Sequence, residues 1–171
     1  MAVREFDIIV YGATGYTGRL VAEHFVREYG NAADGPKWAM AGRSQDKLEE
    51  VRSEIGAPSS TPLIVADADD PASLEAMCNR TKVVLTTVGP YQLYGDALVA
   101  ACVKTGTDYA DLCGEPAWMR EQIDLHHEAA KKSGARITFS AGFDSIPFDL
   151  GVLMLQQEAV KRHGSPAPRV K

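Results

Sequence analysis

The chain has 171 residues, of which 45% are hydrophobic and 24% are charged, and its formal net charge is −5. This composition is typical of one soluble globular domain, and the negative charge argues against nucleic-acid binding, which needs clustered Lys and Arg. No apolar stretch reaches the roughly 20 residues that span a bilayer, so membrane association is not indicated.

The cysteines and the N-terminus predict a cytoplasmic location. Cys78, Cys102 and Cys113 are an odd number at unrelated spacings, which favours reduced thiols over a disulfide framework or a zinc site. The first predicted strand follows the N-terminus closely, and no signal peptide precedes it.

The most informative segment is a strand that runs into spaced glycines. The apolar run Ile8–Tyr11 is followed by Gly12-x-x-Gly15-x-x-Gly18 and then by a helical pattern. A strand, a tight turn and a helix N-terminus in this order hold a dinucleotide diphosphate, because the free N–H groups of the first turn face the anion. The alternative is a glycine-rich turn without a ligand.

Strand and helix patterns alternate along the rest of the chain. Predicted strands after the first are Lys37–Ala41, Pro62–Asp67, Lys82–Val88, Asp108–Leu112 and Arg136–Ser140. Predicted helices after the first are Asp46–Ile55, one after Asp70-Pro71, Tyr94–Lys104, Pro116–Lys132 and Phe148–Val160. The alternation predicts an α/β fold: a Rossmann-type, doubly wound parallel sheet of about six strands in three αβα layers, in the order 3-2-1-4-5-6.

Two details of the later helices are also predicted. Met119, Ile123 and His127 should share one side of the Pro116–Lys132 helix. Asp144-Ser145, before Pro147, indicates a helix cap.

The end of the second strand indicates which dinucleotide binds. NAD-binding folds place an Asp or Glu there, whereas this chain has Gly42-Arg43-Ser44. A guanidinium pairs with phosphate through two parallel hydrogen bonds, and a Ser hydroxyl can add a third. We therefore predict NADP (NADPH) as the cofactor, with Arg43 as the main determinant. Arg43 as a plain surface residue is the alternative.

Two further strand ends belong to the same predicted site. Asp67 ends the third strand, where it can accept a hydrogen bond from the adenine, although a solvated turn carboxylate is the alternative. Val88, Gly89 and Pro90 end the fourth strand, where the nicotinamide half is expected because ligands bind where strand order reverses. Pro90 as a simple strand stop is the alternative.

The last part of the chain predicts a boundary between two regions. Residues 1–162 form the expected dinucleotide-binding domain, and the Pro-rich, polar residues 163–171 have the composition of a linker. The preceding helix is apolar on more than one side, and such a helix needs covering. We predict that a partner domain covers it; a dimer contact is the alternative.

Five motifs stand out along the chain: Gly-Ala-Thr-Gly-Tyr-Thr-Gly, Ala-Gly-Arg-Ser, Val-Gly-Pro-Tyr-x-x-Tyr-Gly, Tyr-Ala-Asp-Leu-Cys-Gly-Glu and Gly-Phe-Asp-Ser-Ile-Pro-Phe-Asp-Leu-Gly. With this set of motifs the chain resembles the saccharopine dehydrogenase-like oxidoreductases, in particular the trans-acting enoyl reductases of actinobacterial lipid synthesis. The resemblance implies an NADP-dependent oxidoreductase with a further C-terminal α+β domain, which would shape the pocket for an apolar acyl or imine-type substrate and could form a homodimer.

The resemblance also assigns cofactor contacts. The diphosphate would be held by Gly12, Thr14, Gly15, Tyr16, Thr17 and Gly18, the 2′-phosphate by Arg43 and Ser44, and the nicotinamide half would be flanked by Gly89, Pro90 and Tyr91.

No catalytic residue is assigned. The groups that the fold would bring to the rim are Tyr91, Tyr94, Asp111, Glu115 and Asp144, and each has a capping or structural role as its alternative. No metal site is predicted, because the adjacent His126 and His127 point about 100° apart on a helix. A non-catalytic NADP(H)-sensing module is the alternative function, and the closing Gly-Phe-Asp-Ser-Ile-Pro motif favours the enzyme.

Overall fold

The computed structural model describes residues 4–30 and 34–170. Residues 1–3, within the predicted domain's N-terminal segment, residues 31–33, and Lys171 at the end of the predicted linker lie outside the described residues. The six described strands are β1 (Phe6–Tyr11), β2 (Trp38–Gly42), β3 (Leu63–Val65), β4 (Thr81–Thr86), β5 (Asp108–Ala110) and β6 (Ile137–Thr138). They form one sheet in the order β3-β2-β1-β4-β5-β6, and every neighbouring pair is parallel. The predicted fold class and strand order are thereby confirmed.

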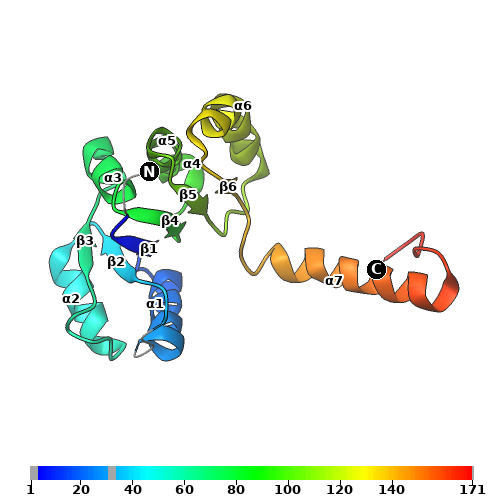
Figure 1. The fold of residues 1–171 in the computed structure, drawn as a ribbon, viewed down its shortest axis with the longest axis horizontal. Coiled ribbons are helices and arrows are strands. Elements are labelled where there is room, and N and C mark those ends of the chain that lie inside the picture. The colour runs from blue at the N-terminus through cyan, green and yellow to red at the C-terminus, as the bar shows by residue number, and fades with distance from the viewer. Residues whose placement is uncertain (1–3, 31–33, 171) are drawn as a thin grey trace.

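Helices cover both faces of this sheet (Figure 1). They are α1 (Tyr16–Tyr29), α2 (Gln45–Glu54), α3 (Pro71–Cys78), α4 (Tyr91–Tyr94), α5 (Asp96–Thr105), α6 (Pro116–Ser133) and α7 (Ile146–His163). Helices α1 and α2 lie on one face, and α3, α5 and α6 lie on the other.

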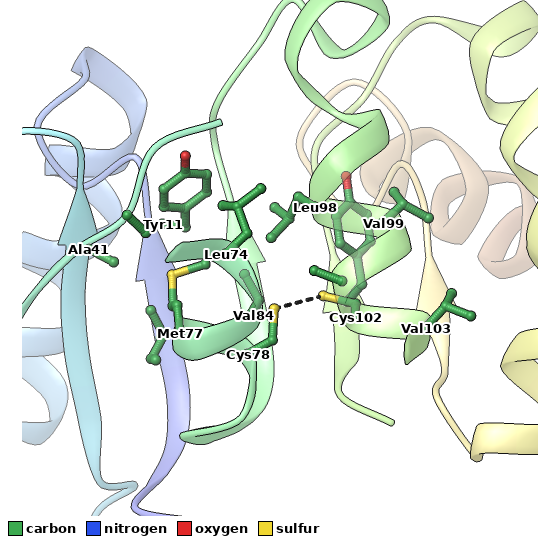
Figure 2. Packing of buried hydrophobic residues seen from close by; sticks show 14 of the residues in the cluster. Tyr11, Ala41, Leu74, Met77, Cys78, Val84, Leu98, Val99, Cys102 and Val103 are labelled. Carbon is green, nitrogen blue, oxygen red and sulfur yellow. Dashed lines mark hydrogen bonds between the residues drawn. The ribbon is translucent and has the colours of Figure 1, made fainter. Parts of the chain in front are cut away.

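Each face has its own hydrophobic core, because successive side chains of a strand point to opposite faces. Val10 of β1 packs with Phe25 of α1 and Leu48 of α2. Ile9 and Tyr11, on either side of Val10, join the larger core beneath α3 and α5. Figure 2 shows this larger core, where the Cys78 and Cys102 sulfur atoms lie 3.6 Å apart as free thiols.

Four strands end two residues earlier than the sequence pattern predicts. These are β3, β4, β5 and β6, which end at Val65, Thr86, Ala110 and Thr138. Beyond the ends of β4 and β5, backbone N–H groups donate to side chains. The Val88 N–H donates to Thr86 Oγ1 at 3.2 Å, and the Cys113 N–H donates to Asp111 Oδ1 at 3.0 Å. The apolar residues past the strand ends therefore belong to loops at the carboxyl edge of the sheet.

The predicted helix Tyr94–Lys104 corresponds to α5, which begins two residues later at Asp96, and the short helix α4 before it was not predicted, with Gly95 between the two helices. The Gly95 N–H closes α4 by donating to the Tyr91 carbonyl at 2.7 Å. A Cβ atom at Gly95 would lie 2.4 Å from the Trp118 ring. Trp118 also donates from Nε1 to Asp96 Oδ1 at 2.6 Å, so α6 packs directly against the junction of α4 and α5.

The side of α6 on which Met119, Ile123 and His127 were predicted to lie together is not its buried side. Its buried residues are Trp118, Gln122 and Ala130, whereas Ile123 is 38% exposed and His127 lies largely in solvent. Trp118 and Gln122 both bond to Asp96 at the start of α5, and these two contacts set the rotation of α6.

Helix α7 projects away from the sheet (Figure 1) and buries none of its residues. Ser145, in the predicted Asp144-Ser145 cap, does occupy the N-cap position of α7, but its side chain makes no cap hydrogen bond, and the Ile146 N–H donates to the Gly142 carbonyl. The tail turns back along α7, where Gln156 and Ala167 exchange two hydrogen bonds. Within residues 4–30 and 34–170, no helix is both long and apolar enough to cross a membrane.

Candidate functional site

An open cleft of about 280 Å³ lies at the carboxyl edge of the sheet, beside the β1–β4 pair where strand order reverses. Such crevices are where doubly wound sheets bind ligands. Of the predicted site residues, those that line it are Gly12, Thr14, Gly15, Arg43, Asp67, Val88 and Gly89. It is also lined by Tyr11, Gly42, Ala68, Asp69, Thr87 and Tyr94.

The glycines at the β1–α1 turn bring backbone very close to backbone. Gly12 has φ +89°, in the left-handed region that favours glycine. A Cβ atom at Gly18 would lie 2.0 Å from the Gly12 carbonyl oxygen, so α1 approaches the turn only because residue 18 lacks a side chain. At Gly15 the added atom would meet only Gly12 O at 3.4 Å, which leaves the outer side of the turn open to the cleft.

The N-terminus of α1 has no side-chain cap and no acidic residue in its first turn. In contrast, the Ser44 hydroxyl accepts from the Lys47 N–H at the start of α2, and Asp70 accepts from the Ala72 N–H at the start of α3. The first-turn N–H groups of α1 therefore remain available, and together with the helix dipole they favour an anion at this point.

The β2 and β3 ends bring opposite charges to one side of the cleft. The exposed Arg43 lies beside Asp67 and Asp69, and no ion pair links Arg43 to another side chain among residues 4–30 and 34–170. Asp67 Oδ1 accepts from the Asp69 N–H at 3.1 Å, which fixes the β3–α3 turn. Beneath them, burial raises the pKa of the Tyr11 hydroxyl, with a smaller contribution from Asp67, so Tyr11 is a neutral group in the cleft.

The other side of the cleft is formed by the turn between β4 and α4. Val88, Gly89 and Tyr94 line it, and the Gly89–Pro90 peptide bond is cis. Tyr91 is only 5% exposed and packs against Trp118, with ring centroids 5.7 Å apart. Its hydroxyl donates to the Thr86 carbonyl at 3.3 Å, so the Tyr91 side chain anchors the turn from below.

Two of the rim carboxylates bind backbone. Glu115 accepts from the Tyr91 and Gln92 N–H groups. The buried Asp111 accepts from the Ser140 N–H at 2.7 Å, as well as from Cys113 and the Tyr109 hydroxyl. Burial raises the pKa of the Asp111 carboxyl, and these hydrogen bonds act in the opposite direction.

Six predicted site residues do not line the cleft. Tyr16 is 85% exposed and Thr17 is also exposed, at the start of α1, whereas Gly18 is buried beneath the turn. Ser44 caps α2, Pro90 is exposed beside the cleft, and Tyr91 is buried. No group of three or more His, Cys, Asp or Glu side chains suited to a metal ion occurs in the described part of the chain.

Tyr11, Ala68, Asp69 and Thr87 line the cleft but were not predicted. Their only signal in the sequence is their position at or just after the end of a strand.

A doubly wound sheet with a glycine-rich turn, an uncapped helix N-terminus and a cleft at the switch point defines a dinucleotide-binding α/β domain. The sequence matches the family described as the saccharopine dehydrogenase NADP binding domain over residues 8–137. The chain belongs to this family, and its cofactor is NADP.

Curated relatives are similar across most of the chain. It is 53% identical to a trans-acting enoyl reductase of Mycobacterium leprae over 159 residues, which are 92% of this chain and 37% of the relative. It is also 53% identical to a trans-acting enoyl reductase of Mycobacterium tuberculosis over 161 residues, which are 94% of this chain and 38% of the relative. The chain thus spans less than two fifths of the length of these relatives.

Solved structures share the fold at low sequence identity. Apo saccharopine dehydrogenase (L-Glu forming) from Saccharomyces cerevisiae superposes with a TM-score of 0.64 at 18% identity, covering 93% of this chain and 32% of that one. Triphenylmethane reductase from Citrobacter sp., complexed with NADP(H), gives a TM-score of 0.58 at 18% identity, covering 90% and 56%.

Proposed function

We propose that this chain is the cofactor-binding part of an NADPH-dependent oxidoreductase that reduces an enoyl group, as the names of its relatives describe. The identity of 53% to two trans-acting enoyl reductases carries this proposal. Because the chain matches less than two fifths of each relative, we propose that residues corresponding to the remainder complete a pocket for an apolar acyl substrate and a homodimer contact. The exposed apolar side chains of α7 support such a covering partner.

The diphosphate is proposed to lie against the start of α1, next to Gly12, Thr14, Gly15, Tyr16, Thr17 and Gly18. The absence of a side-chain cap there supports this placement, because a bound anion would then satisfy the free N–H groups. Tyr16 and Thr17 would contribute through backbone N–H groups, since both side chains point into solvent.

The two ends of the cofactor are proposed to lie on opposite sides of the cleft. Arg43 would bind the 2′-phosphate and Ser44 would assist, while Asp67 would face the adenine. The Val88-Gly89-Pro90 turn, held from below by Tyr91, would flank the nicotinamide. When bound, the nicotinamide supplies a hydride, and a proton from a protein group or water completes the reduction of the substrate.

The chain's own residues bind and orient the cofactor in this proposal. Asp111 and Glu115 are engaged with backbone N–H groups, so neither carboxylate is assigned as the proton donor. Tyr94, which is 41% exposed and lines the cleft, and the exposed Asp144 remain candidates.

Cofactor titration of the chain with NADPH and NADH tests the proposal. NADPH should bind more tightly, and Arg43→Ala should remove most of this preference. Loss of charge-assisted hydrogen bonds to the 2′-phosphate should weaken NADPH binding about 10- to 100-fold and leave NADH binding unchanged. Arg120→Ala, which alters an exposed pair with Asp124 on α6, is the matched control. Equal affinities for the two cofactors in the unmodified chain would refute the assignment.

A non-catalytic NADP(H)-sensing module is the second candidate, and the engagement of Asp111 and Glu115 with backbone is the observation that favours it. NADPH oxidation in the presence of an enoyl thioester, measured on the full-length protein, separates the two. We also propose a cytoplasmic location, which the three free thiols support.

A further inference from the structure

We infer that Glu115 is a positioning residue for the cofactor: its carboxylate, which comes from the β5–α6 connection, fixes the turn that flanks the nicotinamide. This inference rests on the proposed function. The two carboxylate oxygens accept separately from two consecutive backbone N–H groups. Tyr91 N lies 2.8 Å from Oε1, and Gln92 N lies 2.8 Å from Oε2.

These contacts supply hydrogen-bond acceptors for two backbone N–H groups at the start of α4. The residue at the N-cap position of α4 supplies none. The residue that precedes α4 is Pro90, which makes no side-chain cap hydrogen bond. Free N–H groups in a first helical turn need acceptors, and a carboxylate is the strongest that a protein side chain offers. Glu115, which lies 24 positions after Tyr91 in the sequence, supplies both acceptors.

Glu115 does not cap its own helix. It occupies the position before Pro116 at the start of α6, yet its side chain makes no cap hydrogen bond there. Pro116 has no N–H to satisfy, which lowers the demand for a local cap. The carboxylate is therefore directed across to α4, and its role belongs to the cleft rather than to the stability of α6.

The turn that Glu115 holds is weakly packed otherwise. Gly89 and Pro90 are exposed, and a Cβ atom at Gly89 would meet nothing closer than 3.5 Å. Below the turn, the buried Tyr91 ring is the main anchor. The Tyr91 ring thus ties the turn to the core, while Glu115 fixes the direction of the backbone above it. Loss of Glu115 should loosen this turn and leave the fold intact.

The binding of two ligands distinguishes a positioning role of Glu115 from a general structural role. NADPH reaches both sides of the cleft, whereas adenosine 2′,5′-bisphosphate reaches only the side with Arg43 and Asp67. Glu115→Gln can accept from one N–H but faces the other with its own NH₂ group. It should weaken NADPH binding about ten-fold and reduce the rise in nicotinamide fluorescence on binding. Binding of adenosine 2′,5′-bisphosphate should stay unchanged.

Two further variants make the test specific. Glu121→Gln removes an exposed carboxylate from α6, the helix that Glu115 precedes, and should behave as the unmodified chain. Glu115→Asp keeps the charge and should lose less NADPH affinity than Glu115→Gln. The Asp variant also carries the test if the Gln variant does not fold, because it too should weaken NADPH and spare the bisphosphate.

The outcomes are distinct. Unchanged NADPH affinity and fluorescence in Glu115→Gln, or an equal loss of affinity for both ligands in a folded variant, would overturn the positioning role. Failure of the unmodified chain to bind either ligand would instead refute the proposed function.

Discussion

The glycines at the β1–α1 turn have separate roles that their spacing predicts, because each role depends on backbone geometry alone. Gly12 adopts φ +89°, Gly18 lies against the Gly12 carbonyl, and Gly15 faces the cleft. The spacing could not predict that Tyr11 and Thr87 line the same cleft. Their position depends on which face each side chain takes and on how β1 and β4 align, and both are tertiary properties.

Gly18→Ala tests the close approach of α1 to the turn. The new methyl group would lie 2.0 Å from a backbone oxygen, which cannot move as a side chain can. We expect the free energy of unfolding to fall by about 3 kcal/mol, the upper end for overpacking, in chemical denaturation.

Gly151→Ala is the matched control. Gly151 lies in α7 with nothing within 4 Å of its added Cβ atom. Its replacement should raise stability by up to about 1 kcal/mol through helix propensity. A similar response at the two positions would contradict the packing of α1 described above.

At the scale of elements, the rim depends on carboxylates that tie neighbouring connections together. Asp111 follows β5 and holds the loop after β6 through Ser140, which has φ +58°, an uncommon conformation for a residue other than glycine. The sequence predicts Asp111 inside the strand Asp108–Leu112 and Glu115 just after it, whereas β5 ends at Ala110 and both residues follow it. It could not predict their partners, because those partners lie in segments that only the folded sheet brings near. The junction of α4 and α5 at Gly95 packs against Trp118 of α6, which is likewise a contact between segments that only the folded chain brings together.

Asp111→Asn tests the effect of this buried carboxyl on stability. Asn can still accept from the two N–H groups at one oxygen, and its NH₂ group can donate to the Tyr109 hydroxyl oxygen. Burial raises the pKa of Asp111 in the folded chain above its usual 3.8. The folded state therefore binds more protons than the unfolded state between the two pKa values, and the contribution of Asp111 falls as pH rises through that interval.

The measurement is the difference in unfolding free energy between the unmodified chain and Asp111→Asn, followed from below pH 3.8 upward. The unmodified chain should be most stable relative to Asp111→Asn at the lowest pH. This advantage should decline as pH rises, until the pH has passed the raised pKa of Asp111. Surface carboxylates with lowered pKa values, such as Glu5 and Asp7, act in the opposite direction but cancel in the difference. An increase with pH would show that hydrogen bonding outweighs burial at Asp111.

At the scale of the whole molecule, the alternation of strands and helices was enough to predict the sheet order and the two helical layers. Right-handed crossovers between parallel strands leave few other arrangements. The placement of α7 did not follow from the same rule, because that rule applies to helices between two strands and no strand follows α7 among the described residues 164–170. Its exposed apolar residues were predicted from composition, and they include Phe148, Leu150, Leu153, Met154 and Leu155.

One substitution made at two positions tests whether α7 stands apart from the domain. Leu98 in α5 is 2% exposed within the core, and Leu153 in α7 is 52% exposed. Leu98→Ala should lower the free energy of unfolding by about 2–5 kcal/mol, because it removes buried methyl groups and leaves a cavity. Leu153→Ala makes the same chemical change in a helix but should alter stability by no more than about 0.5 kcal/mol. Equal losses at the two positions would mean that α7 is covered in solution. Sedimentation would then tell whether a second copy covers it, since only that contact depends on protein concentration.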